Sequence, residues 1–150
     1  MKMVVQRVSR AAVRVGNREV GAVGRELLVL VGVERGDGAA EVERAANRLA
    51  TLRVFEDAGG KMNLGVDEVG GEMLVVSQFT LAGSIRRGRR PDFARAAPAA
   101  DAEPLVKALC SALRARGLGV ATGVFRAMME VELVNDGPVT LIWDDPPAAG

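Results

Sequence analysis

The strongest candidate for chemistry is a polar segment at the end of an apolar run. Residues 73–76 are apolar, and Ser77, Gln78, Phe79 and Thr80 follow them directly. Polar side chains at the end of a buried strand must find hydrogen-bond partners or lie in a cleft. If the strand continues, alternation puts Ser77 and Phe79 on one face and Gln78 and Thr80 on the other. On the pattern alone, a strand that simply reaches the surface is the favoured interpretation.

A second candidate is the segment from Asn135 to Thr140, which contains Asn135-Asp136-Gly137-Pro138. Between two apolar runs, this composition is typical of a tight turn. Bonds that precede proline are far more often trans than cis in folded proteins. The pattern therefore favours an ordinary turn with a trans Gly137–Pro138 bond.

A third candidate is a cluster of arginines between Ser84 and Arg95, where Asp92 is the only acid. The net charge of the whole chain is only +1, which gives no general attraction to nucleic acid. Guanidinium groups match phosphate oxygens in geometry, so the cluster could bind phosphates. A solvated basic loop explains it equally well. The arginines are Arg86, Arg87, Arg89, Arg90 and Arg95.

The composition excludes several kinds of catalytic site. The chain has no histidine, so a Ser-His-Asp triad, a Cys-His pair and a His-ligated zinc are impossible. Cys110 is the single cysteine, and its helical spacing with Leu109 and Leu113 favours a buried structural thiol. We expect no metal site and no cofactor. A catalytic base would have to be a carboxylate, a backbone group, water or a group of the substrate.

The elements that must position these segments follow an α+β pattern. Strands are predicted by apolar runs, several of them joined by hairpins. Two helices are predicted, the first capped by Asp37 and the second opened by Asp101 and ended by Gly117. We expect one domain over residues 1–143, with a mostly antiparallel, barrel-like sheet and two main helices. Residues 144–150 are expected to form a disordered tail. The predicted strands cover 3–8, 11–15, 20–23, 26–33, 54–55, 73–81, 129–133 and 139–143.

The sequence also carries expectations about location. The first residues have no long apolar stretch before their charges, and the longest apolar run, residues 27–33, is too short to span a membrane. A single cysteine suits a reducing compartment. We expect a cytoplasmic protein without a membrane partner; a cysteine-poor secreted protein whose leader is absent is the alternative.

Five short motifs, in this order and at these spacings, make the chain similar to a known family over about residues 1–143. The set resembles the bacterial D-aminoacyl-tRNA deacylases, also called D-Tyr-tRNA deacylase-like proteins. The resemblance implies a homodimer that hydrolyses the ester bond of D-aminoacyl-tRNA and of mischarged glycyl-tRNA, and that rejects L-aminoacyl-tRNA. The motifs are Gln6-Arg7-Val8, Gly60-Lys61-Met62-Asn63, Ser77 to Leu81, Gly88 with Pro91-Asp92-Phe93, and Asn135 to Thr140.

The resemblance also implies roles for single residues. The segment from Ser77 to Thr80 would form the catalytic floor, with backbone N–H groups near Phe79 and Thr80 stabilising the developing oxyanion. Gly137 and Pro138, joined by a cis bond, would enter the site of the partner subunit. There they would bind the substrate ammonium group and reject the L form. Arg7 would brace that loop, and Phe125 would lie by the terminal adenosine of the tRNA.

Two other function classes stay open. The first is a non-catalytic tRNA-binding module that uses the Arg86–Arg90 loop, and the second is a small-molecule-binding homodimer without an RNA partner. The chain also departs from the family next to Phe125. Small residues often follow that phenylalanine in the family, whereas Arg126, Ala127 and Met128 follow it here, so the adenosine contacts are expected to differ in detail.

Overall fold

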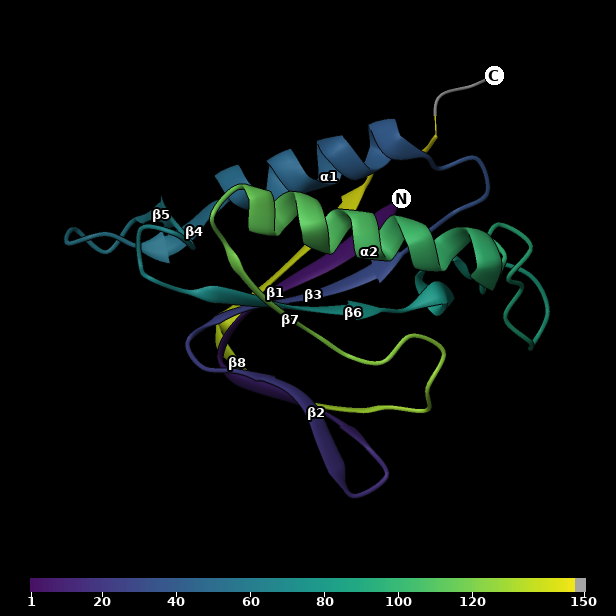
Figure 1. The fold of residues 1–150 in the computed structure, drawn as a ribbon, viewed down its shortest axis with the longest axis horizontal. Coiled ribbons are helices and arrows are strands. Elements are labelled where there is room, and N and C mark those ends of the chain that lie inside the picture. The colour runs from purple at the N-terminus through teal and green to yellow at the C-terminus, as the bar shows by residue number, and fades with distance from the viewer. Residues whose placement is uncertain (148–150) are drawn as a thin grey trace.

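The computed structural model describes residues 1–147 of the chain. The chain begins with a strand pair, a third strand and a helix, and it ends in one long strand (Figure 1). The elements are β1 (Lys2–Val15), β2 (Arg18–Val23), β3 (Glu26–Gly32), α1 (Ala39–Thr51), β4 (Arg53–Glu56), β5 (Met62–Gly65), β6 (Glu72–Ser77), the 3₁₀ helix η1 (Phe79–Ala82), α2 (Ala99–Ala115), β7 (Gly119–Thr122) and β8 (Glu130–Asp144).

The main sheet has the order β2-β1-β3-β6-β7. β3 and β2 pair with the first and second halves of β1, and β8 pairs with β1 along nearly its whole length. β1 pairs antiparallel with β2, β3 and β8, as β4 does with β5 in a separate hairpin. The β3–β6 and β6–β7 pairs are parallel. Parallel neighbours need a crossover connection, and α1 and α2 lie in those two connections. The α+β class with a mostly antiparallel sheet is confirmed.

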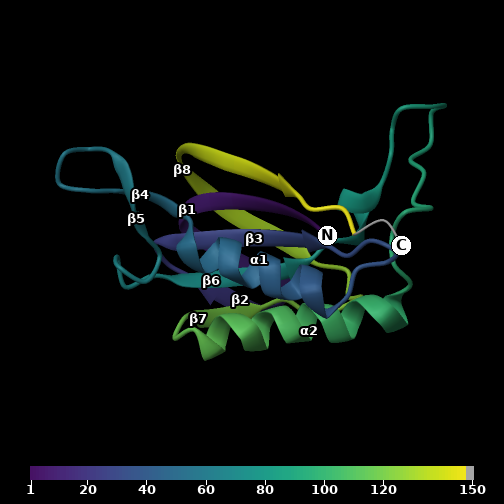
Figure 2. The same ribbon diagram turned by 90° about the horizontal axis from the view of Figure 1, so that it is seen from above.

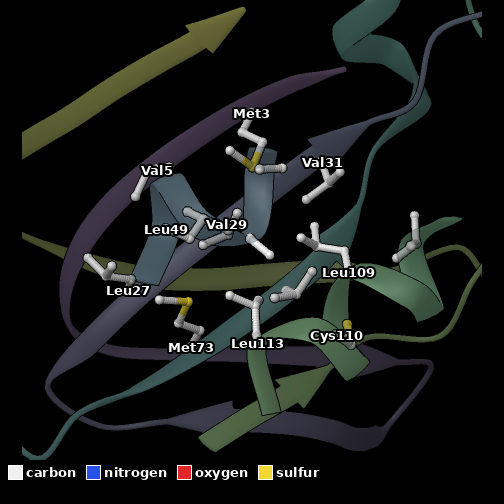
Figure 3. Packing of buried hydrophobic residues seen from close by; sticks show 14 of the residues in the cluster. Met3, Val5, Leu27, Val29, Val31, Leu49, Met73, Leu109, Cys110 and Leu113 are labelled. Atoms are coloured by element: carbon white, nitrogen blue, oxygen red, sulfur yellow. The ribbon is translucent and has the colours of Figure 1, made fainter. Parts of the chain in front are cut away.

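The two helices lie side by side over one face of this sheet (Figures 1 and 2). Their apolar sides cover residues of β1, β3 and β6 that point towards them. In Figure 3, Leu49 of α1 and Leu109 of α2 lie over Val29 and Val31 of β3. All four side chains are fully buried, and this packing fixes β3 and β6, the strands that lead to the candidate site.

The opposite face of the sheet holds a second, smaller apolar cluster. Leu28 of β3, Leu74 of β6 and Val13 of β1 are its fully buried members. The sheet curls around this cluster until β2 approaches β7, where a Cβ added to Gly21 would collide with the carbonyl oxygen of Thr122. The result is the nearly closed, barrel-like sheet that we expected.

The ends of the helices differ in part from the prediction. α1 begins after Gly38, and Asp37 accepts hydrogen bonds from the backbone N–H of Glu34 and the nitrogen of Met1 instead of capping the helix. α2 begins at Ala99, two residues before Asp101. Gly117 does follow the end of α2, with the positive φ of +83° that glycine adopts easily.

The C-terminal residues are placed as far as residue 147. Asp144 closes β8, and the carboxylate of Asp145 accepts a hydrogen bond from Arg44 at 2.7 Å. The rest of the tail that we expected over 144–150, residues 148–150, lies outside the described residues. Within residues 1–147, neither helix is long and apolar enough to cross a membrane.

Candidate active site

The first candidate segment leaves the sheet earlier than predicted. β6 ends at Ser77, and residues 79–82 form the 3₁₀ helix η1. The expected alternation of residues 77–80 between two faces is therefore wrong. The N–H of Gln78 donates to Val31 O at 2.7 Å, and the 3₁₀ helix that follows packs against Gly32 at the end of β3. As the first N–H groups of a 3₁₀ turn, those of Phe79 and Thr80 have no acceptor within it.

A cavity of about 810 Å³ opens at this turn. Such a volume is within the range of small-ligand sites. The side chains of the turn are ordered around it, because Gln78 Nε2 donates to Thr80 Oγ1 at 3.1 Å. The turn, the start of α2 and the β7–β8 loop provide the walls. The lining residues include Ser77, Gln78, Phe79, Thr80, Ala97, Ala99, Ala102, Phe125, Arg126, Met128 and Met129.

Phe79 connects this cavity to the arginine-rich loop. Its ring is 56% exposed and packs edge to face on Phe93, with centroids 5.2 Å apart. Gly83 allows this packing, since a Cβ there would lie 2.7 Å from the Phe93 ring. Backbone hydrogen bonds between Ser84 and Asp92 then close the base of the loop. The loop is thus held beside the cavity.

The arginines of the loop fall into two groups. Arg95 pairs with the buried Glu34, whose Oε1 lies 2.9 Å from Arg95 Nη2, so it has a structural role. The other four are exposed, and none forms an ion pair within residues 1–147. These four are Arg86, Arg87, Arg89 and Arg90.

The second candidate segment is a bulge inside β8, so the predicted tight turn between two strands is wrong. Gln6 pairs with Thr140 and Val8 pairs with Asn135, which leaves residues 136–139 opposite Arg7 alone. Asn135 closes the bulge, because its Oδ1 accepts from Val139 N at 2.7 Å and its Nδ2 donates to Thr140 Oγ1 at 2.8 Å. The Gly137–Pro138 peptide bond is cis, in contrast to the trans bond favoured by the pattern.

Arg7 is buried beneath this bulge. Its Nε donates to Asp136 O at 2.9 Å, and its Nη1 donates to Val54 O in β4 at 2.7 Å. Hydrogen bonds that involve a charged donor are stronger than neutral ones. Arg7 therefore ties the bulge to the β4–β5 hairpin, while Gly137 and Pro138 remain exposed.

Gly137 has no room for a side chain. Its φ is +139°, and an added Cβ would lie 2.8 Å from Val139 Cγ2 and 3.2 Å from Arg7 Nη2. Both neighbours are themselves held, Val139 by Asn135 and Arg7 by its two carbonyl acceptors. Glycine at this position is therefore required by the local structure.

The two candidate segments do not meet within one chain. Arg7, which faces the bulge, lies opposite Leu27 of β3, whereas Ser77 lies opposite Val31. These points on β3 are four residues apart, roughly 13 Å along the strand. None of residues 135–140 lines the cavity at Ser77.

Phe125 does reach that cavity, from the loop between β7 and β8. The next residue, Arg126, has a φ of +64°, the only positive φ of a residue other than glycine within residues 1–147. Its exposed side chain also borders the cavity. Sequence reasoning noted Arg126 as a departure from the family but gave it no role.

Other residues of the site were missed for identifiable reasons. Phe93 belongs to one of the family motifs, but its packing on Phe79 depends on how the chain folds between them. Asn135 bonds to Val139 and Thr140, only four and five residues away, but this contact forms only because the segment is a bulge and not a tight turn. Ala97, Ala99 and Ala102 line the cavity without any chemical signature. Within residues 1–147, no group of three or more His, Cys, Asp or Glu side chains could hold a metal ion.

Comparison with known proteins gives a consistent result. Residues 4–144 match the family model described as D-Tyr-tRNA(Tyr) deacylase. The chain is 62% identical over 144 residues to a D-aminoacyl-tRNA deacylase of Anaeromyxobacter dehalogenans, covering 96% of this chain and 97% of that one. It is 53% identical to the D-aminoacyl-tRNA deacylase of Myxococcus xanthus, covering 99% and 98%.

Solved structures are also similar. One titled "c-Myc DNA Unwinding Element Binding Protein" superimposes with a TM-score of 0.91 at 41% identity, covering 97% of this chain and 99% of that one. Another, titled as a probable eukaryotic D-amino acid tRNA deacylase, superimposes with a TM-score of 0.83 at 18% identity, covering 96% and 98%. At that identity, the second likeness concerns the fold alone.

Proposed function

The chain belongs to the D-Tyr-tRNA(Tyr) deacylase family of hydrolases, and we propose on this basis that it cleaves D-aminoacyl-tRNA into free amino acid and tRNA. One feature of the site carries the proposal. The 3₁₀ turn at residues 79–82 borders a cavity of about 810 Å³ and begins with two N–H groups that have no acceptor within the turn. Such donors suit the oxyanion that develops when an ester is hydrolysed.

The proposed chemistry needs no histidine. Water adds to the ester carbonyl carbon, the bond to the 3′ oxygen breaks, and that oxygen takes up the proton that the water loses. The N–H groups of Phe79 and Thr80 stabilise the oxyanion, and the neighbouring 2′-hydroxyl of the substrate assists. Thr80 positions water or substrate through Oγ1, which is itself held by Gln78. Ser77 and Gln78 complete the floor of the cavity.

Selection against the L form is assigned to Gly137 and Pro138 of a partner subunit. Two features support a shared site: the bulge of one chain is remote from the cavity of the same chain, and it exposes both residues. Arg7 and Asn135 hold the bulge rigidly enough to act as a steric filter. Glycine has no side chain to be rejected, so glycyl-tRNA is a substrate too.

A homodimer also accounts for the outer edge of β8. This strand pairs only with β1 within the described residues, so its other edge is open. Ile142 is 80% exposed, and Val134 and Leu141 are each 41% exposed. Open edges with apolar side chains tend to be covered by another chain. We assign this surface to contact between two copies in the cytoplasm.

We assign the tRNA to the surface that carries the cavity and the arginine-rich loop. Phe125 borders the cavity, where an aromatic ring can stack on the terminal adenosine. The exposed Arg86, Arg87, Arg89 and Arg90 lie on a loop held beside the cavity through Phe79 and Phe93. These arginines would contact phosphates of the tRNA.

The direct test is hydrolysis of matched D- and L-aminoacyl-tRNA and of glycyl-tRNA by the purified chain. We expect release of the D-amino acid and of glycine, with the L-ester cleaved at least about a hundredfold more slowly. Equal hydrolysis of both enantiomers would refute the assigned selection. Salt-dependent tRNA binding without turnover would instead identify the non-catalytic RNA-binding module.

A further inference from the structure

A second cavity, of about 540 Å³, lies beside the candidate active site. Ser77 and Phe125 line both cavities, so the two adjoin at the end of β6 and the start of the β7–β8 loop. One wall of the second cavity is α2. The opposite wall is formed by residues 122–125. Nothing in the proposed reaction uses this space.

The wall contributed by α2 is polar at its rim. Glu103, Lys107 and Ser111 follow one another at intervals of four residues and Arg114 comes three residues later, so all four share one face of the helix. All four line the cavity. Beneath them, the buried Val75, Val106 and Cys110 form an apolar floor.

The two cations at the rim are available to a ligand. Lys107 Nζ lies 3.1 Å from Glu103 Oε1, but these side chains are 73% and 41% exposed, and such pairs contribute little. Arg114 Nη2 donates to Val120 O at 3.0 Å, which holds the guanidinium at the rim. Arg114 forms no ion pair within residues 1–147. An apolar floor below a cationic rim suits a flat base that carries a phosphate.

We propose that this cavity is a second nucleotide subsite, resting on the function proposed above. It takes the penultimate nucleotide of the RNA strand whose terminal adenosine ester occupies the neighbouring cavity. Phe125 and Ser77 line both cavities, so a strand that ends against Phe125 in the first cavity can continue into the second, which adjoins it there. The base lies over Val75 and Val106, and the phosphodiester lies between Lys107 and Arg114.

The test compares the D-aminoacyl esters of adenosine and of the dinucleotide CpA. The added nucleotide should raise kcat/KM at least about tenfold in the wild-type chain, the usual effect of one good contact to a charged group. The ratio of the two kcat/KM values should fall close to one in the double variant Lys107→Ala, Arg114→Ala. A second variant, Ser111→Trp, fills the cavity mouth without changing charge and should lower the same ratio.

The matched control is the double variant Arg25→Ala, Arg48→Ala, which removes two exposed cations that form no ion pair within residues 1–147. It should keep the wild-type ratio, and thermal unfolding should show that every variant is folded. A wild-type ratio near one, or a ratio unaffected by both subsite changes, would overturn the subsite while leaving the deacylase intact. Failure of the wild-type chain to cleave either ester or D-aminoacyl-tRNA would overturn both proposals.

Discussion

Arg7, Asn135 and Gln78 act at the residue scale by holding neighbouring atoms in place. Arg7 and Asn135 bind backbone atoms on either side of the bulge, and Gln78 binds the hydroxyl of Thr80. The groups assigned to catalysis and selection are mostly backbone groups. Side-chain substitutions should therefore separate positioning from chemistry.

Thr80 offers the clearest separation. In Thr80→Ala the hydroxyl is lost but the N–H of residue 80 remains, so we expect kcat to fall only about tenfold, less than the roughly 10²–10³-fold typical of losing an oxyanion donor. Thr80→Ser keeps the hydroxyl and should stay near the wild-type rate. Single-turnover hydrolysis of a D-aminoacyl-tRNA measures both. Complete loss in Thr80→Ala would assign the chemistry to the hydroxyl.

Arg126 adopts a backbone conformation that suits glycine better. Its φ is +64°, which costs a residue with a side chain roughly 1–2 kcal/mol. Part of this is offset by the greater freedom of glycine in the unfolded chain, so Arg126→Gly should raise the free energy of unfolding by up to about 1 kcal/mol. Urea unfolding tests this, with Arg87→Gly, at an ordinary φ, as the control that gains nothing. A loss of stability would show that the Arg126 side chain makes stabilising contacts.

Glu26 is buried, and its Oε2 has no hydrogen-bond partner within residues 1–147. Burial, and then the charge of Glu72, raise the pKa of its carboxyl above the ordinary 4.5. The neutral form is therefore favoured in the folded state. The contribution of the Glu26 carboxyl to the free energy of unfolding is therefore fully present below about pH 4.5, and it is lost as the pH rises through the folded-state pKa.

Glu26→Gln removes this ionisation. We expect the variant to gain stability over the wild type at pH 7 and to lose most of that advantage near pH 4. The measurement is urea unfolding at the two pH values. An equal difference at both would show that the titration of Glu26 does not contribute.

At the element scale, short connections place the functional segments beside the sheet. The 3₁₀ turn directly follows β6 and the bulge lies within β8, and packing holds both strands in position. The arginine-rich loop follows the turn directly and is closed by backbone pairing of Ser84 with Asp92. Its position relative to the cavity is therefore fixed, although its side chains are exposed.

Neutralising Arg86, Arg87, Arg89 and Arg90 together to glutamine should raise KM for aminoacyl-tRNA and flatten its dependence on salt, because fewer counterions are released on binding. Hydrolysis rates measured over a series of salt concentrations test this. The matched control replaces Arg18, Arg25, Arg48 and Lys61, four exposed cations without an ion pair within residues 1–147. An unchanged KM in the loop variant would favour a solvated loop, as the small-molecule-binding alternative requires.

At the scale of the whole molecule, the proposed site needs two chains. Ala99→Trp should block the cavity, since Ala99 lines it, and Gly137→Val should distort the bulge, where even one Cβ lies 2.8 Å from Val139 Cγ2. Each variant alone should be inactive. In a heterodimer of the two, one site combines an intact cavity with an intact bulge.

An equal mixture with random pairing should recover about a quarter of the wild-type activity, since half of the dimers are mixed and each mixed dimer has one good site. Co-expression with two affinity tags allows the mixed dimers to be purified and assayed. Inactive mixed dimers, or a chain that stays monomeric in solution, would contradict a shared site.

Local patterns in the sequence were sufficient to predict the α+β fold class and most of the helices and strands. Apolar periodicity located both helices and most of the strands, and Gly117 marked the end of α2, because these features depend on neighbours a few residues away. The short strands β5 and β7 were not predicted, and β1 and β8 were each predicted as two strands. The order and spacing of the short motifs together were sufficient to identify the family. A single motif would not have been sufficient to identify it.

The tertiary structure decided how the two segments are used. The bulge opposite Arg7 depends on hydrogen bonds between residues 129 positions apart, and the turn after Ser77 depends on Val31 of β3. The adjoining cavities at Phe125 exist only because α2 packs across β6 and β7. Contacts at such separations leave no period in the sequence, so residues 77–80 were predicted as a continuing strand and 135–138 as a turn. Their actual courses, a 3₁₀ turn and a bulge, are set by the packed sheet.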